Sequence, residues 1–296
     1  MKIEGVLVPV VTPFDANGKF NPAALEALID TFVEQQVAGI VVCGSTGEYY
    51  ALTEQERAQV LETAARAGKG RLTLIAGINS LSPADAIARA QQAEKLGYDG
   101  LMLSPAPYSL PQQNEIVAYF REVAAATPLP IIMYNFPARV GVEIGLDAVR
   151  ELSQIPNIVA IKESSGDFSR AMALIQADLK NFDIIAGCDD QAADFLFWGV
   201  RSWISGGANV FPGEQAAMIR AAGEGKWDEV QALMRGMYPV IRSMESGDYN
   251  QKAKLGCLRH GVDVGAVRLP LQSLSNEDAE AFKALVTTYS EGRRNA

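Results

Sequence analysis

Eight short apolar runs recur along the chain, and each is followed by a segment whose apolar residues have helical spacing. The runs, mostly rich in β-branched residues, cover residues 5–11, 39–43, 72–76, 100–103, 130–134, 158–162, 182–186 and 202–205. The helical segments cover residues 21–33, 53–68, 82–97, 113–126, 146–153, 169–179, 191–198 and 214–222. Strands that alternate with helices predict parallel pairing with right-handed crossovers. Eight such units in a chain of this length predict the α/β class and a (β/α)8 TIM barrel.

A doubly wound parallel sheet is the alternative fold, but it usually has fewer units and a glycine-rich first turn. Here the first strand is followed by a Thr-Pro-Phe-Asp turn. We therefore expect a barrel over residues 1–225 and a C-terminal helical region over residues 226–296. Helical spacing in this region covers residues 227–243, 250–260 and 276–289. Its first helix has apolar side chains that we expect to form an assembly surface: Leu233, Met234, Met237, Val240 and Ile241.

Charge and composition exclude several classes of function. The net charge of −9 argues against nucleic acid and anionic membrane surfaces as partners. No apolar run approaches the roughly 20 residues that span a bilayer, and the N-terminus lacks the apolar region of a signal peptide. The three cysteines lie far apart, which indicates reduced thiols and a cytoplasmic protein. His260 is the only histidine, so neither a catalytic triad nor a multi-histidine metal site is expected.

Lys162 is the last residue of the sixth apolar run, which reads Ile-Val-Ala-Ile-Lys. In a barrel of this kind, catalytic side chains lie at the carboxyl ends of the strands. A lysine that leaves a buried strand there is surrounded by apolar groups, which lower its pKa and favour the neutral amine. A neutral lysine amine forms Schiff bases with carbonyl substrates. The alternative is a lysine that extends to solvent from the strand end and has no chemical role.

Other polar groups follow strands of the same predicted barrel and are expected at the same mouth. Ser45 and Thr46 lie in a glycine-bounded loop after the second strand, whose N–H groups and hydroxyls suit an anion such as a carboxylate. Tyr134 ends the fifth strand and has the chemistry for proton transfer. Arg139 follows in the next loop, where it either faces solvent or binds a second carboxylate. After the last two strands we expect further substrate contacts from Gly187, Asp189 and Ser205.

Together these residues resemble the superfamily of dihydrodipicolinate synthase and N-acetylneuraminate lyase. The motifs that carry the resemblance lie on three strands, in the order of the family: Gly44-Ser45-Thr46-Gly47-Glu48, Tyr134-Asn135-Phe136-Pro137 and Ile161-Lys162-Glu163. The similarity covers the whole chain, from the Val-Thr-Pro-Phe at residues 11–14 to the Val-Arg-Leu-Pro-Leu at residues 267–271. The resemblance implies chemistry without a metal or another cofactor, and a homotetramer built as a dimer of dimers.

The resemblance also implies roles for the candidate residues. Lys162 matches the lysine that condenses with pyruvate or another 2-oxo acid, and Tyr134 matches the tyrosine that moves protons. Ser45 and Thr46 match the pair that holds the substrate carboxylate, with Ser45 placed to relay a proton to Tyr134. Arg139 matches the arginine that meets the carboxylate of the second substrate in the synthases. The function implied is that of a Schiff-base-forming lyase, which makes or breaks an aldol bond of a 2-oxo acid.

The sequence departs from the synthase pattern in several places. Ser109 stands where the synthases have a tyrosine that reaches a neighbouring subunit's site, and Glu54 and Arg57 replace histidines of lysine-regulated members. The acidic pair Asp189 and Asp190 is closer to the sialic-acid-cleaving enzymes. Three alternatives therefore stay open: a catabolic 2-keto-3-deoxy sugar-acid aldolase or dehydratase, a pyrroline-4-hydroxy-2-carboxylate deaminase, and a barrel that binds a 2-oxo acid without turnover.

Overall fold

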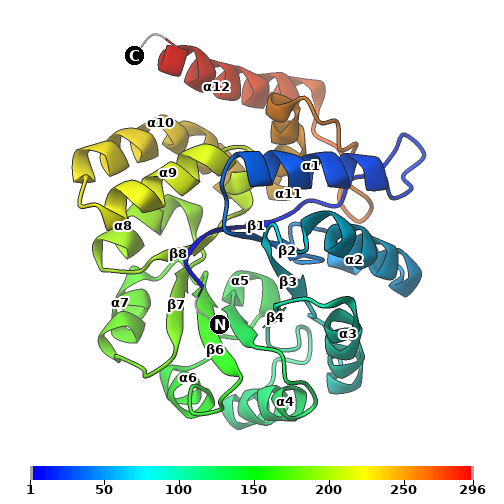
Figure 1. Cartoon of the computed structure of the whole chain (residues 1–296), viewed down its shortest axis with the longest axis vertical. Helices are drawn as coiled ribbons and strands as arrows, with labels where there is room; N and C mark the ends of the chain where they lie inside the picture. The colour runs from blue at the N-terminus through cyan, green and yellow to red at the C-terminus, as the bar shows by residue number, and fades with distance from the viewer. Residues whose placement is uncertain (1–2, 295–296) are drawn as a thin grey trace.

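Eight parallel strands form a closed barrel at the centre of the molecule (Figure 1). The structure, a computed structural model, describes residues 3–294. β1 pairs with both β2 and β8, which closes the barrel and confirms the predicted (β/α)8 architecture. The strands are β1 Gly5–Pro9, β2 Gly39–Val42, β3 Thr73–Gly77, β4 Gly100–Leu103, β5 Ile131–Asn135, β6 Ile158–Glu163, β7 Asp183–Ala186 and β8 Ser202–Ile204.

Helices surround the barrel, and several begin at residues that cap them. The Thr53 hydroxyl accepts a hydrogen bond from the backbone N–H of Glu56, whose carboxylate accepts one from the N–H of Thr53 in return. None of the helices within residues 3–294 has the length and apolarity needed to cross a membrane. The helices around the barrel are α1 Pro22–Glu34, α2 Glu54–Gly68, α3 Pro83–Leu96, α4 Gln113–Ala125, α5 Pro137–Val140, α6 Leu146–Leu152, α7 Phe168–Gln176, α8 Ala192–Phe197 and α9 Pro212–Gly223.

Short helical turns separate some strands from their helices, and the sequence pattern does not predict them. These are α5 and the 3-10 helices η1 Tyr49–Ala51, η2 Asp189–Gln191 and η3 Gly206–Asn209. A single turn has too few residues to show a helical period. The turns matter for function because all four follow the carboxyl ends of strands, which is the face where catalytic loops of such barrels lie.

Alternation along the strands separates two apolar layers. Side chains that point inward fill the barrel: Leu7, Val41, Ile75, Met102, Ile132, Ala160, Ile185 and Ile204. Those that point outward pack beneath the helices in a larger layer. In β5 and β6 the inward series continues from Ile132 and Ala160 to Tyr134 and Lys162, which are register partners. Because side chains alternate with a period of two, both residues face the interior at the mouth of the barrel.

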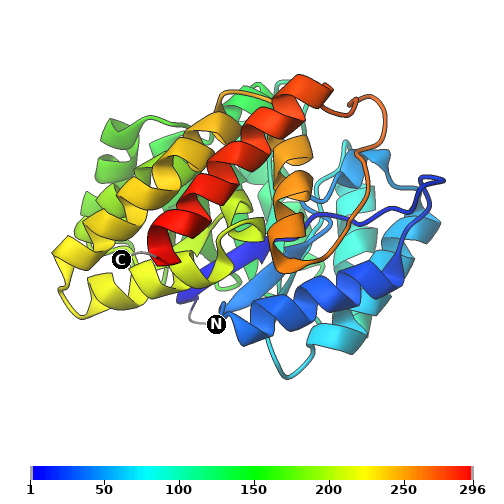
Figure 2. The same cartoon turned by 90° about the horizontal axis from the view of Figure 1, so that it is seen from above.

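Three further helices follow the barrel: α10 Trp227–Glu245, α11 Tyr249–Gly256 and α12 Asn276–Arg294. Figure 2 shows α12 lying across α10 and α11. The predicted helix over residues 250–260 begins as α11 and then tightens into the 3-10 helix η4 Cys257–His260. The apolar pattern therefore predicts the extent of this helix but not the change in its winding.

The apolar face of α10 is used mostly within the chain, so the predicted assembly surface is wrong for its three buried side chains and stays a prediction for the two partly buried ones. Met237, Val240 and Ile241 are buried, and Leu233 and Met234 pack against the same apolar layer. α10 packs against α9 on one side and α12 on the other. A helical apolar stripe shows that a helix is covered, but it does not show whether the cover comes from the same chain.

Candidate active site

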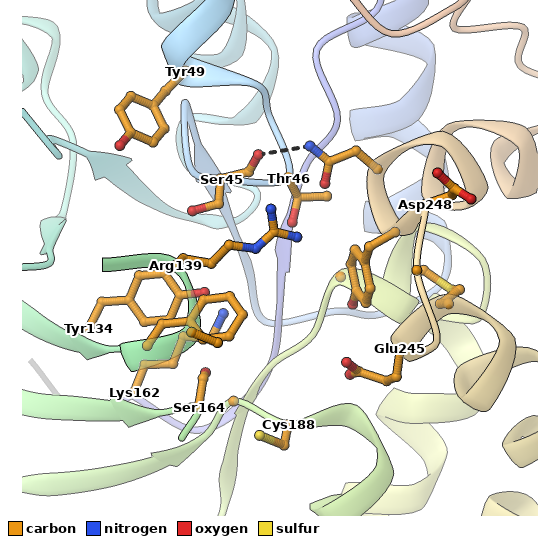
Figure 3. A pocket seen from close by; sticks show the side chains of 18 of the residues that line it. Ser45, Thr46, Tyr49, Tyr134, Arg139, Lys162, Ser164, Cys188, Glu245 and Asp248 are labelled. Atoms are coloured by element: carbon orange, nitrogen blue, oxygen red, sulfur yellow. Dashed lines mark hydrogen bonds between the residues drawn. The ribbon is translucent and has the colours of Figure 1, made fainter. Parts of the chain in front are cut away.

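A cavity of about 490 Å³ lies at the carboxyl ends of the strands. Six of the eight predicted site residues line it: Ser45, Thr46, Tyr134, Arg139, Lys162 and Gly187. Figure 3 shows the Tyr134 and Lys162 side chains beside one another on their strands, with Arg139 and the loop of Ser45 and Thr46 across from them. The cavity has the size of a small-molecule site, and it collects a nucleophile, a phenol and a possible anion cradle in one place.

Lys162 is held in an almost closed environment. Only 5% of the residue is exposed, and its Nζ atom lies 4.4 Å from the centroid of the Tyr134 ring. Burial lowers the pKa of Lys162 to about 8, while the negative charges of Asp189 and Glu245 and the nearby Cys188 act in the opposite direction. A substantial fraction of the amine is therefore neutral near physiological pH, which is the state that attacks a carbonyl carbon.

The strand end beside Lys162 is fixed by a buried carboxylate on the other face of the sheet. Glu163 accepts hydrogen bonds from the Asn135 amide and from Nε of Arg170, each at 2.9 Å. It also accepts one from the backbone N–H of Ser165 at 2.7 Å. Asn135 and Glu163 are register partners, just as Tyr134 and Lys162 are. The contact between Asn135 and Glu163 thus stabilises the strand register that places Tyr134 and Lys162 in the cavity.

Tyr134 keeps its proton. Burial raises the pKa of its hydroxyl, and the Arg139 charge and the nearby Ser164 hydroxyl offset only part of that effect. A phenol held in this state can donate a proton to a departing hydroxyl and take it back. Within residues 3–294, the hydroxyls of Ser45 and Tyr134 are not joined by a hydrogen bond. The proton relay between these two residues therefore stays a prediction.

Gly187 makes room for Ser164. A Cβ atom at residue 187 would lie 2.0 Å from the Ser164 Oγ and 2.5 Å from the backbone oxygen of Glu163. Ser164 also lines the cavity, although it is not among the predicted site residues. Its position two residues after Lys162 is a usable signal, because residues i and i+2 of an extended segment share a face.

The loop over residues 44–48, which we call the carboxylate loop, follows β2. Thr46 is buried and Ser45 is half-buried, and both line the cavity. The hydroxyl of Thr12 donates to the carbonyl of Gly47 at 2.6 Å, which ties the loop to the end of β1. Small residues leave the backbone N–H groups of such a loop accessible, so it can hold an anion.

The structure does not bring Asp189 and Ser205 to the cavity wall. The Asp189 carboxylate accepts hydrogen bonds from the Trp203 indole at 3.0 Å, the Gly207 N–H at 2.9 Å and the Tyr249 hydroxyl at 2.5 Å. Ser205 is fully buried. Both residues lie at the strand ends where the sequence places them, but their direct contact with substrate stays a prediction.

The wall opposite β5 and β6 comes from the turn between α10 and α11 and the helix ends beside it, none of which is predicted to belong to the site. Glu245, Asp248, Tyr249 and Asn250 line the cavity there. Burial and the charges of Asp189 and Asp190 raise the pKa of Glu245 to about 7. In Figure 3 the Glu245 carboxylate points into the cavity. α10 and α11 follow the last strand of the barrel, so the alternation of strands and helices does not predict which end of the barrel they contact.

Tyr108 and Ser109 lie in the loop after β4 and do not line the cavity. Tyr108 is 93% exposed and has a left-handed backbone with φ of 74°. Ser109 is also exposed. Neither side chain therefore completes the site within a single chain, in keeping with the departure from the synthase pattern at residue 109.

These observations define a class of enzyme: a (β/α)8 barrel with a buried lysine of lowered pKa and a tyrosine beside it, suited to Schiff-base chemistry. Residues 2–289 match the Dihydrodipicolinate synthetase family, and the chain belongs to that family. It is a lyase, and it works through a Schiff base, as the family's enzymes do.

Named relatives share the sequence and the fold over nearly their whole length. The 4-hydroxy-tetrahydrodipicolinate synthase of an Exiguobacterium species is 32% identical over 291 residues, 98% of this chain and 99% of that protein. The chloride-inhibited dihydrodipicolinate synthase of Acinetobacter baumannii, solved in complex with pyruvate, is 29% identical with a TM-score of 0.94, over 98% of this chain and 99% of that one. A catalytic-lysine mutant of the Ruminococcus gnavus sialic acid aldolase is 26% identical with a TM-score of 0.93, over 99% and 97%.

Proposed function

We propose that Lys162 is the nucleophile and that pyruvate, or a closely related 2-oxo acid, is its substrate. The observation that carries the proposal is a lysine 5% exposed, with its pKa lowered to about 8, at a strand end inside the cavity. Its neutral amine adds to the keto carbon, water leaves, and loss of a proton from the neighbouring carbon gives an enamine. Related proteins support the choice: one was solved with pyruvate and another carries a catalytic lysine.

The other cavity residues take complementary parts. The backbone N–H groups of Ser45 and Thr46 hold the substrate carboxylate, and Tyr134 gives a proton to the departing water and later recovers it. Arg139 is exposed at the cavity wall and is the cation available to a second acidic group. Gly187 leaves the space in which the Ser164 side chain lies at the cavity wall.

The second partner of the reaction has two candidates. The curated relatives are named 4-hydroxy-tetrahydrodipicolinate synthase, which supports condensation of the enamine with an aldehyde. The carboxylates of Glu245 and Asp248 on the opposite wall favour a hydroxyl-rich partner instead, since carboxylates accept hydrogen bonds from hydroxyls and repel anions. This second candidate is aldol cleavage or dehydration of a 2-keto-3-deoxy sugar acid.

The cellular location and the oligomeric state are proposed from the membership of the same family. We expect the chain to act in the cytoplasm as a homotetramer, with residues 226–296 as a C-terminal helical region appended to the barrel. Exposed apolar side chains that do not line the cavity support an assembly, among them Leu81, Tyr108, Phe197 and Trp198.

Borohydride reduction in the presence of pyruvate tests the proposed chemistry. An imine between Lys162 and pyruvate should be reduced to a stable secondary amine, which mass spectrometry of the digested protein locates on the peptide with Lys162. Lys162→Arg should abolish the adduct and leave the fold intact. An adduct on another lysine, or no adduct with any 2-oxo acid tried, would refute the proposal.

A further inference from the structure

The carboxylate loop is held from behind by the C-terminal region. The Asn250 amide, at the start of α11, donates to the carbonyl of Ser45 at 3.1 Å and to the Tyr50 hydroxyl at 3.1 Å. The first of these bonds is the dashed line at Ser45 in Figure 3. One turn later on the same helix, Lys254 forms an ion pair with Glu48 at 2.7 Å. The two ends of the loop are thus attached to one helix.

Glu48 is an unusual residue for the end of such a loop. It is fully buried, and its backbone lies in the left-handed region with φ of 54° and ψ of 39°. A residue other than glycine holds this conformation only where its surroundings enforce it. The Glu48 Oε2 atom accepts the backbone N–H of Arg268 at 2.8 Å, and its own N–H donates to the carbonyl of Ser45 at 3.1 Å. The side chain therefore fixes a strained turn beside the cavity.

Lys254 is almost completely buried, so water is a poor substitute for Glu48 as its partner. The residue is 3% exposed, and its ammonium donates to the carbonyl of Ala266 at 2.8 Å and lies 4.1 Å from the centroid of the Phe14 ring. Burial lowers the pKa of Lys254, and the Glu48 charge opposes that shift. A buried charge with a single ionic partner couples the positions of the two groups, because moving either one exposes an unpaired charge to apolar surroundings.

We propose that Asn250, Lys254 and Glu48 are positioning residues that hold the carboxylate loop in its substrate-binding shape. The inference rests on the proposed function, in which the N–H groups of Ser45 and Thr46 bind the substrate carboxylate. Preorganised donors act only when their spacing matches the anion, and Gly44, Gly47 and the half-buried Ser45 provide little side-chain packing to set that spacing. The C-terminal region therefore sets carboxylate affinity through the shape of the loop, and the pair of Lys254 and Glu48 does so from outside the cavity lining.

The alternative is that Asn250, Lys254 and Glu48 only attach the C-terminal segment to the barrel. Another contact already provides such an attachment. The Arg268 guanidinium binds the Glu56 carboxylate at 2.5 and 2.9 Å and donates to the carbonyls of Gly18 and Ala51. These guanidinium contacts do not involve residues 45–48, which Arg268 meets only through the hydrogen bond from its backbone N–H to Glu48. They provide a matched control, because Glu56→Gln weakens the ion pair while glutamine can still complete the capping box of α2.

The test measures how borohydride trapping at Lys162 depends on pyruvate concentration. Two variants of the full-length protein remove the positioning contacts: Asn250→Ala, and the double variant Glu48→Gln with Lys254→Met. The double variant leaves no unpaired buried charge and so avoids the main reason for misfolding. We expect the half-saturating pyruvate concentration to rise about 10-fold or more in both, because a displaced loop loses a charge-assisted hydrogen bond from its N–H groups to the pyruvate carboxylate. The trapping rate at saturation should change less than about 3-fold.

The control variant separates positioning from stability. Glu56→Gln should lower the melting temperature and leave the half-saturating pyruvate concentration unchanged. The inference is overturned if the two test variants fold and bind pyruvate normally, or if their saturated rate falls as much as their affinity. It is also overturned if Glu56→Gln weakens pyruvate binding to the same extent. Absence of trapping in the unmodified protein would refute the proposed function, and this inference with it.

Discussion

The reactivity of Lys162 comes from a balance between burial and acidic neighbours. Burial is the larger influence and lowers the pKa, while Asp189 and Glu245 restore part of it and leave a value of about 8. A deeper burial without these groups would give an amine that is always neutral but a weaker base. A more exposed one would stay protonated at neutral pH. The acidic wall supplied by α10 is therefore part of the chemistry of the lysine as well as of the pocket.

The rate of imine formation should follow the neutral fraction of Lys162. Between about pH 6 and pH 10 the trapping rate at low pyruvate should rise with pH, with a midpoint near 8, because only the deprotonated amine attacks. Glu245→Gln removes a negative charge that raises the pKa of Lys162, so the midpoint should move to lower pH. Asp248→Asn alters an exposed carboxylate on the same wall and should leave the midpoint in place. A midpoint that moves upward in Glu245→Gln would contradict this balance.

Tyr134 should be essential for proton transfer and dispensable for binding. Tyr134→Phe removes the hydroxyl that protonates the departing water, so we expect imine formation to slow by about 10²-fold or more. The pyruvate dependence should change little, since the carboxylate loop is untouched. Ser109→Ala is the matched control and should have only a mild effect, because Ser109 is exposed and does not line the cavity. A near-normal rate in Tyr134→Phe, or a large loss in Ser109→Ala, would show that the proton takes another path.

The position of a residue at a strand end predicts a site residue correctly where its side chain continues the inward-facing alternation of the strand. Lys162 and Tyr134 point into the cavity because the inward series of β6 and β5 leads to them. The same reasoning does not predict the orientation of the Asp189 side chain. Its carboxylate turns to Trp203, Gly207 and Tyr249. Tyr249 lies 60 residues further along the chain, so no local pattern could reveal that the carboxylate is already occupied.

At the scale of elements, the spacing between β6 and β7 depends on Gly187. A methyl group there would meet the Ser164 hydroxyl, which can rotate away, and the Glu163 carbonyl, which cannot. Gly187→Ala should therefore separate the strand ends, displace Lys162 and lower the trapping rate at least about 10-fold, with a stability loss of about 1–3 kcal/mol. Adding Ser164→Ala should not restore the rate, because the carbonyl remains. Kinetics and melting temperatures that match the unmodified protein would show that the strands can adjust.

The C-terminal helices show what an apolar pattern leaves undecided. The stripe on α10 predicts a covered face, yet the cover is α9 and α12 of the same chain. The pattern also cannot say which end of the barrel receives the turn between α10 and α11. That turn brings Glu245, Tyr249 and Asn250 to the cavity, and its position is fixed by buried polar contacts such as that between Lys254 and Glu48. Such contacts join residues about 200 positions apart in the sequence, and they produce no periodic pattern from which they could be predicted.

At the scale of the whole molecule, most of the large exposed apolar side chains fall into two groups, and Tyr238, Leu258 and Leu269 belong to neither. The first patch lies on the loops after β2, β3 and β4 and consists of Tyr50, Leu81, Tyr108 and Leu110, which are 44%, 70%, 93% and 53% exposed. The second consists of Phe197 and Trp198 at the end of α8, 63% and 46% exposed. β4 and β8 are opposite one another in the closed barrel, so the patches lie on different sides. Exposed groups of this size commonly mark contacts between proteins.

Two separate patches on one chain predict two kinds of self-contact and hence a tetramer with two-fold symmetry in each contact. Light scattering at micromolar concentration should give about four times the mass of the chain. Trp198→Asp places a charge in the second patch, and because the first patch is unaffected the product should be a dimer rather than a monomer. Leu258→Asp, at an exposed apolar residue outside both patches, should remain tetrameric. A monomer in the unmodified protein would refute the assembly, and a tetramer in Trp198→Asp would exclude the second patch as an interface.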